Sequence, residues 1–180
     1  MKLSHATAAL LIALCLLLAC SSKSNANVSA KDAVEQALHQ SGVHDIKVDE
    51  DKDKRLITLT GDVHDDASRM QAGTVAQAAA PGWSIANQIA LKPAGAEGKA
   101  ADISKNIDEA IEHTYKAALI GNHLDKAGIH FSAKNGVLML TGNVDDPDTR
   151  TKAEALGKTV PNVREVVNKL DVKHQPATTR

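Results

Sequence analysis

"LTGDV", at Leu59–Val63, returns in the second half of the chain as "LTGNV", at Leu140–Val144. In both places a glycine interrupts an apolar run just before a cluster of acidic residues. The likeness extends without a gap from residues 56–92 to residues 137–173. The matched pairs include Leu59 with Leu140, Gly61 with Gly142, Asp65 with Asp146, Arg69 with Arg150, and Asn87 with Asn168. Such a repeat predicts two copies of one folding unit.

Hydrophobic periodicity predicts the order α-β-β-α-β in each copy. The expected strands cover residues 43–49, 56–63 and 83–91 in the first copy, and 129–133, 137–144 and 163–172 in the second. The helix before each copy carries apolar or small residues at helical spacing: Val34, Ala37 and Leu38 in the first, and Ile103, Ile107, Ala110, Ile111, Thr114 and Ala118 in the second. The fold class is therefore α+β, with two small sandwich domains of a three-stranded mixed sheet and two helices each.

These patterns divide the chain into six segments. We expect a signal peptide over 1–19, a lipidated tether over 20–29, a first domain over 30–92, a linker over 93–101, a second domain over 102–173, and a disordered tail over 174–180. The linker is rich in Ala, Gly and Lys. Each domain is small enough that packing against the other would stabilise it.

The end of the signal segment, Leu17-Leu18-Ala19-Cys20, resembles a bacterial lipobox. The resemblance implies that Cys20 becomes the acylated first residue of the mature protein, with Ser21 after it directing the protein to the outer membrane. Several acyl chains would anchor the protein without spanning the bilayer. The alternative is an ordinary signal peptide that contains a chance cysteine. The second cysteine, Cys15, lies within the signal, so no disulfide is expected.

The charge balance excludes a bulk electrostatic binder of polyanions. The chain has 21 Lys and Arg against 22 Asp and Glu, for a net charge of −1. No nucleic-acid partner is expected from this balance.

The repeated glycines and acids fit the start of a helix. We expect Gly61 and Gly142 to form the sharp turn from strand to helix, where positive φ is often required. Asp65 and Asp146 are candidate N-caps, and Pro147 fits the first helical turn.

A second repeated feature is an asparagine on the apolar face of each last strand. An inward-facing amide needs hydrogen-bond partners. We expect Asn87 and Asn168 to bind backbone groups near the Thr-Gly turn of their own domain; a ligand role is the alternative.

Together these residues resemble the BON domain (bacterial OsmY and nodulation). The likeness rests on LTGDV and LTGNV, on the helices that begin with an acid and contain "SR" or "TR", and on "VREVVNKLDV" at Val163–Val172. The first copy departs from the pattern where Gly82-Trp83 replaces Val163-Arg164. The resemblance implies a periplasmic or outer-membrane protein that attaches to phospholipid and supports envelope integrity or osmotic tolerance, and it implies no catalytic residue.

The residues themselves offer no catalytic site. G-x-S-x-G, H-E-x-x-H and C-x-x-C are absent from the sequence, and the histidines are scattered. Asp49, Asp51 and Asp53 alternate like calcium ligands, but Lys54 stands where the loop needs glycine. We expect no enzyme activity, no cofactor and no metal.

The expected partner is an anionic phospholipid membrane on the periplasmic face of the outer membrane. Candidate contacts lie on the helix before the second repeat, at Tyr115, Lys116, Leu119 and Ile120, where a ring and a cation suit a headgroup boundary. Ordinary packing of Tyr115 and Leu119 is the alternative. A protein-interaction adaptor that recruits an envelope enzyme or assembly factor is the rival function, and the oligomeric state stays open.

The central strands carry apolar residues on both faces. If Ile57, Leu59, Leu138 and Leu140 face the helices, Leu56 and Thr58 face the other way, as do Val137 and Met139. That outer face predicts either domain-on-domain packing or a protein partner.

Overall fold

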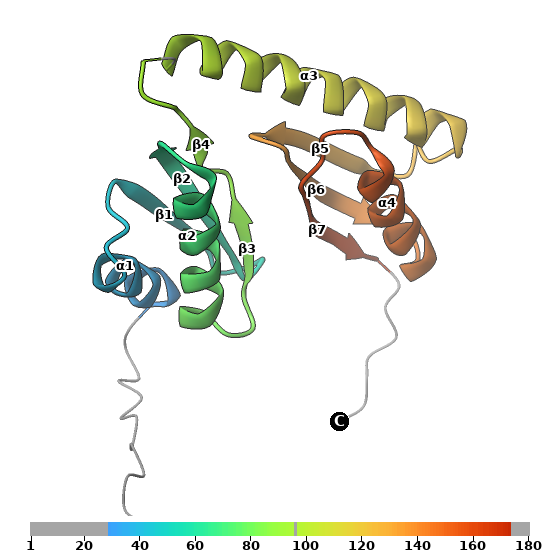
Figure 1. The fold of residues 1–180 in the computed structure, drawn as a ribbon. Helices are drawn as coiled ribbons and strands as arrows, with labels where there is room; N and C mark the ends of the chain where they lie inside the picture. Colours follow the sequence, from blue (N-terminus) through green and yellow to red (C-terminus); the bar gives the residue numbers. More distant parts are fainter. Residues whose placement is uncertain (1–28, 96, 174–180) are drawn as a thin grey trace, which may run out of the picture.

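The computed structural model describes residues 29–95 and 97–173, which form two α+β domains (Figure 1). The first domain contains α1 (Ala30–Gln40), β1 (Ile46–Asp51), β2 (Leu56–Val63), α2 (Asp66–Ala79), β3 (Ser84–Asn87) and β4 (Ala90–Leu91). The second contains α3 (Glu97–Gly121), β5 (Ile129–Lys134), β6 (Val137–Val144), α4 (Pro147–Thr159) and β7 (Glu165–Val172). The predicted fold class and element order are confirmed. The expected signal peptide, Cys20, most of the tether and the tail lie outside the described residues.

The two sheets share one topology. The second strand of each domain is central: β2 pairs antiparallel with β1 and parallel with β3, and β6 pairs in the same way with β5 and β7. The third strand of the first domain is divided, because Gln88 and Ile89 interrupt it between β3 and β4. The prediction of one continuous strand over 83–91 was therefore wrong, whereas β7 runs unbroken.

Alternation along the central strands builds the two cores. Ile57 and Leu59 in β2, and Leu138 and Leu140 in β6, are fully buried against the helices. In the first domain Ala72 on α2 is also fully buried, and its small side chain lets that helix approach the sheet closely.

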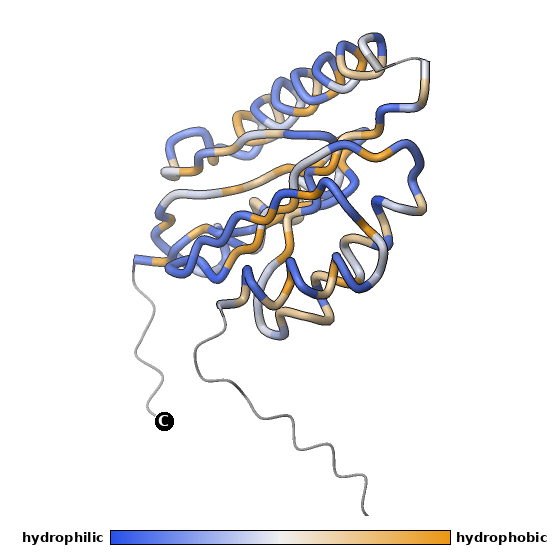
Figure 2. Tube along the Cα trace, turned by 90° about the vertical axis from the view of Figure 1, so that its left-hand side faces the viewer, coloured by the Kyte–Doolittle hydropathy of each residue, from blue (hydrophilic) through white to orange (hydrophobic). Residues whose placement is uncertain are grey.

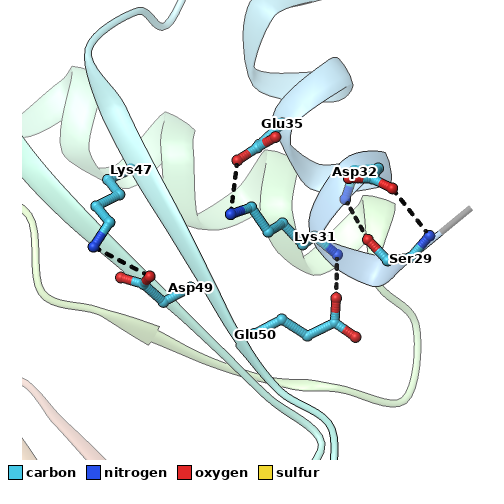
Figure 3. Close-up of polar contacts among 7 residues, drawn as sticks. All are labelled: Ser29, Lys31, Asp32, Glu35, Lys47, Asp49 and Glu50. Carbon is cyan, nitrogen blue, oxygen red and sulfur yellow. Dashed lines mark hydrogen bonds and ion pairs between the residues drawn. The ribbon is translucent and has the colours of Figure 1, made fainter.

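The first helix is fixed at its N-terminal end by a capping box (Figure 3). Asp32 N donates to Ser29 Oγ, and Ser29 N donates to an Asp32 carboxylate oxygen. Lys31 N donates to Glu50 Oε2 at 3.1 Å. The chain therefore enters the first domain at a defined point beside β1.

The first helix of the second domain is much longer than the first helix of the first domain. Helix α3 has 25 residues against 11 in α1. It begins at Glu97, inside the segment predicted as a linker over 93–101, so the linker is shorter than expected. Figure 2 shows α3 crossing one side of the molecule, with hydrophilic and hydrophobic residues alternating along it.

The outer faces of the two sheets pack against each other. Leu56 and Ala86 of the first domain form one buried cluster with Val137 and Val167 of the second, and Met139 packs against it. Of the two alternatives for the outward-facing residues, domain packing is the one observed for Leu56, Val137 and Met139, whereas Thr58 is not part of the cluster.

Candidate functional site

Two of the four residues predicted to bind lipid are buried. Tyr115 is 0% exposed and Leu119 is 3% exposed. The Tyr115 ring packs edge-on against Phe131, and its hydroxyl donates to the backbone oxygen of Ala153 in α4. Burial raises the pKa of the Tyr115 hydroxyl. These two side chains belong to the core of the second domain, so their assignment as lipid contacts was wrong.

The error lies in the rotational phase predicted for α3. The buried face follows residues four apart, Ile111, Tyr115 and Leu119. Ala110 and Thr114, which were expected in the apolar stripe, are exposed, and Ile103 is 58% exposed. Ile103 lies in the N-terminal extension of α3, beyond the part that matches α1. Apolar residues in this extension therefore do not indicate which face of the helix packs against the core.

The other two predicted lipid contacts, Lys116 and Ile120, are on the surface. Ile120 is 52% exposed, and Lys116 is exposed one turn before it. His113 and Ala117 share that outer face, because residues three and four apart on a helix are neighbours. These four side chains, His113, Lys116, Ala117 and Ile120, are called the outer face of α3 below.

The outer face of α3 lies in a stretch without acidic residues. No Asp or Glu occurs from His113 to Leu124. The last acid before it, Glu112, is turned toward the sheet, where its Oε1 accepts a hydrogen bond from Ala133 N at 2.8 Å. Within the described part of the chain, Lys116 forms no ion pair. The outer face thus presents an uncompensated cation beside an exposed isoleucine.

Two carboxylates hold α3 against the β5–β6 hairpin. Asp108 accepts hydrogen bonds from both backbone N–H groups of the hairpin turn, Asn135 N at 2.7 Å and Gly136 N at 2.9 Å. Glu112 is engaged with the same hairpin, whereas Glu109 is exposed and pairs with Lys105 at 3.9 Å. The contacts that fix the helix therefore engage two of its carboxylates, Asp108 and Glu112.

The repeated glycines do not form the turn from strand to helix. Gly61 and Gly142 lie within β2 and β6, paired with the first residues of β1 and β5. Their φ angles are +137° and +114°, so positive φ is confirmed. A Cβ added at Gly61 would lie 2.5 Å from the backbone oxygen of Asp45, and one at Gly142 would collide with the backbone oxygen of Gly128. The glycines admit the close approach of the preceding segment, and the predicted turn role was wrong.

Asp65 and Asp146 are the N-caps of α2 and α4, as predicted. Asp65 Oδ1 accepts from Ser68 N at 2.8 Å, and Asp146 Oδ1 accepts from Thr149 N at 2.7 Å. These backbone hydrogen bonds, with those from the Ser68 and Thr149 hydroxyls, lower the pKa of both carboxyls.

Asn87 and Asn168 bind the helix rather than the Thr-Gly segment. Asn87 Nδ2 donates to Arg69 O at 2.8 Å, and Asn168 Nδ2 donates to Arg150 O at 3.2 Å. Their Oδ1 atoms accept from the backbone N–H two residues further on. The amides are satisfied within each domain, but the predicted partners were wrong.

A family model for the BON domain matches residues 27–93 and 107–174. The chain belongs to the BON family. BON domains are associated with membrane or phospholipid binding and with envelope or osmotic roles. The outer face of α3 therefore lies on the first helix of the second BON domain.

Solved structures add a likeness of low similarity. Two structures of CdsD, a structural protein of the type III secretion system of Chlamydia trachomatis, resemble the chain. The first, of the C-terminal domain, is 13% identical with a TM-score of 0.33 and covers 80% of this chain and 96% of that one. The second is 12% identical with a TM-score of 0.35 and covers 78% and 90%. No curated protein matches the chain.

A groove of about 310 Å³ lies where the first BON domain meets α3. Its floor includes the small and apolar residues Ala90, Leu91 and Ala133. Most of its charged groups are engaged: Asp108 and Glu112 hold the hairpin, and Lys92 pairs with Asp62 at 2.7 Å.

Within residues 29–95 and 97–173, no group of three or more His, Cys, Asp or Glu side chains could hold a metal ion. None of their helices is long and apolar enough to cross a bilayer.

The sequence prediction missed His113 and Ala117, which share the outer face with Lys116 and Ile120. A signal for them was present in the absence of acids from residue 113 to residue 124. It also missed Ala86 and Val167 in the apolar contact between the domains, and Asn135 and Lys169 in the polar contacts, since contacts between distant segments leave no local pattern.

Proposed function

We propose that this protein is a lipid-anchored envelope protein that docks on anionic phospholipid through the outer face of α3. The observation that supports docking there is the pairing of Ile120, 52% exposed, with Lys116 in a stretch that carries no acid. An apolar side chain beside an unpaired cation suits the boundary between acyl chains and headgroups. The association of BON domains with membrane or phospholipid binding supports the choice of phospholipid as the partner.

The expected strength of this contact explains why an anchor would be needed. Burying the exposed part of Ile120 would contribute about 1 to 2 kcal/mol, and one lysine near an anionic surface about 1 kcal/mol. The sum, about 2 to 3 kcal/mol, corresponds to a dissociation constant weaker than about 1 mM. An untethered chain would bind only at millimolar lipid, and tethering would strengthen the contact by raising its effective concentration near the bilayer.

The lipobox-like segment ending in Cys20 would supply that tether. In this proposal an acylated Cys20 holds the protein at the periplasmic face of the outer membrane, and docking of α3 fixes its orientation there. Support of envelope integrity or of osmotic tolerance is the corresponding cellular role. The rival function, a protein-interaction adaptor, would use the same domains without lipid.

NMR titration of the chain from residue 21 with phosphatidylglycerol micelles tests the docking claim. We expect chemical-shift changes confined to residues around His113–Ile120, and their loss in Lys116→Glu. The matched control is Lys152→Glu, which makes the same charge change at an exposed position of α4. Absence of shifts in the parent chain, or equal loss in both variants, would contradict docking through α3 and favour the adaptor.

A further inference from the structure

The interface between the two BON domains is built by equivalent residues of the two repeats. Leu56 and Val137 are the first residues of their central strands, and both lie in the shared apolar cluster. Ala86 and Val167 also match in the repeat and lie in the same cluster. The interface is therefore close to two-fold symmetric, with each domain using the same patch.

Two of the polar contacts between the domains follow the same symmetry. Asn135 Nδ2 of the second domain donates to Gln88 O of the first at 2.8 Å. Lys169 Nζ donates to Lys54 O of the first domain at 2.8 Å and to Ser84 Oγ at 2.6 Å. Asn135 and Lys54 are equivalent, each two residues before its central strand. Gln88 and Lys169 are also equivalent, each directly after the asparagine shared by the repeats.

These two contacts differ in chemistry but serve one geometry. In each, the tip of one hairpin meets the last segment of the other domain's sheet, at Gln88 between β3 and β4 or at Lys169 in β7. Both side-chain donors belong to the second domain, and both reach backbone oxygens of the first. Burial, with a smaller effect of nearby Arg150, lowers the pKa of the Lys169 ammonium, which agrees with its place between the domains.

Asn135 has a second role that Lys169 lacks, because the backbone N–H of Asn135 is hydrogen-bonded to α3. Asn135 N donates to Asp108, while its side chain reaches the first domain. Its φ of +48°, followed by +77° at Gly136, gives the two-residue hairpin its turn. The residue thus connects α3, the hairpin and the first domain within one hydrogen-bonded group.

We propose that Asn135 and Lys169 are positioning residues that fix the first BON domain relative to α3, so that the two domains present the outer face of α3 as one rigid body. The inference rests on the proposed function only in calling that face a docking surface. The fixed orientation itself is a property of the protein without lipid. It can therefore stand or fall apart from membrane binding.

Distance measurement by electron paramagnetic resonance tests this proposal. Both cysteines of the sequence precede residue 21, so the chain from residue 21 contains none. Ala78→Cys on α2 and Ala155→Cys on α4 place one spin label on an exposed position of each domain. The parent chain, without lipid, should give one narrow distance distribution.

The test variants are Asn135→Gly and Lys169→Met. Glycine keeps the turn and the backbone N–H to Asp108, so only the amide contact with Gln88 O is lost. We expect the population outside the main distance to rise about fivefold in Asn135→Gly, which loses one hydrogen bond, and by at least that much in Lys169→Met, which loses those to Lys54 O and Ser84 Oγ. The matched control is Asn162→Gly, an exposed turn asparagine with φ +66° for which the described contacts include none to the first domain.

Three results would overturn the proposal. The first is a parent-like distribution in Asn135→Gly, and the second is a parent-like distribution in Lys169→Met. The third is equal broadening in Asn162→Gly. Vesicle binding is measured separately on the same samples. If the parent chain does not bind vesicles but gives a narrow distance distribution, the proposed function is contradicted and the fixed orientation of the domains is supported.

Discussion

The hydroxyl of Tyr115 in α3 and the backbone oxygen of Ala153 in α4 lie 3.0 Å apart and form a hydrogen bond. The bond joins the two helices of the second domain at a point where Tyr115 is fully buried. A tyrosine that sequence reasoning places at a membrane surface is thus a core residue with a satisfied hydroxyl.

Replacing Tyr115 by phenylalanine distinguishes a core residue from a lipid contact. Tyr115→Phe removes the hydroxyl and keeps the ring, so the free energy of unfolding should fall by about 0.5 to 1.5 kcal/mol. Urea unfolding followed by circular dichroism measures this change. Binding to phosphatidylglycerol vesicles should be unchanged. A loss of binding in the folded variant would show that Tyr115 contributes to docking.

The glycines of β2 and β6 should not tolerate a side chain. Gly142→Ala places a Cβ against the backbone oxygen of Gly128 at φ +114°, so we expect a loss of at least about 1 kcal/mol in the free energy of unfolding. Gly98→Ala is the matched control, because a Cβ there meets nothing within 4 Å and lies in a helix. That variant should be neutral or more stable by about 0.5 kcal/mol. Equal effects of the two substitutions would refute the close-approach explanation.

Glu165 should make stability depend on pH in an unusual direction. Burial between the domains raises the pKa of its carboxyl above the ordinary value of 4.5. The folded state therefore binds more protons than the unfolded state between the two pKa values, and the free energy of unfolding falls as pH rises through that window. Glu165→Gln should remove this decline and be more stable than the parent at neutral pH.

Urea unfolding curves of the parent and of Glu165→Gln, recorded over a pH series, measure this dependence of the free energy of unfolding on pH. Glu109→Gln, at an exposed position of α3, is the matched control and should leave the slope unchanged. An identical pH slope in Glu165→Gln and the parent would show that the carboxyl is not held in a desolvated site.

The N-cap of α4 should give the opposite pH trend. Hydrogen bonds from Thr149 hold the pKa of Asp146 below its usual value of 3.8. The charged cap therefore stabilises the protein above that value, and the stability is lost as pH falls through the lower folded pKa. Asp146→Asn keeps a capping oxygen but does not titrate, so its melting temperature should fall less than the parent's on acidification. Parallel melting curves across pH 2 to 5 would contradict the capping assignment.

Local patterns in the sequence predicted the features that depend on local geometry. Alternation in β2 and β6 gives the inward positions of Leu59 and Leu140, and an acid three residues before a helical N–H gives the Asp65 cap. The outward face of Leu56 and Val137 follows from the same alternation. Each of these inferences needs only the spacing of neighbouring residues.

Features set by tertiary contacts were not accessible from the same patterns. Which face of α3 is buried depends on the residues that contact the sheet. Ile103 misled the prediction because it lies in the N-terminal part of α3 that has no counterpart in α1. The role of Gly61 depends on the approach of Asp45 across the sheet, and the partner of Asn87 is a helix carbonyl at Arg69. In each case the deciding atom comes from a segment that is distant in sequence.

The most direct test of docking through α3 compares its two most exposed isoleucines. Ile103 and Ile120 are 58% and 52% exposed on the same helix, but only Ile120 lies on the outer face beside Lys116. Sedimentation with phosphatidylglycerol vesicles at low salt measures binding of Ile120→Asp and Ile103→Asp. The account predicts that Ile120→Asp abolishes binding and that Ile103→Asp binds like the parent. Equal binding by the two variants would contradict it.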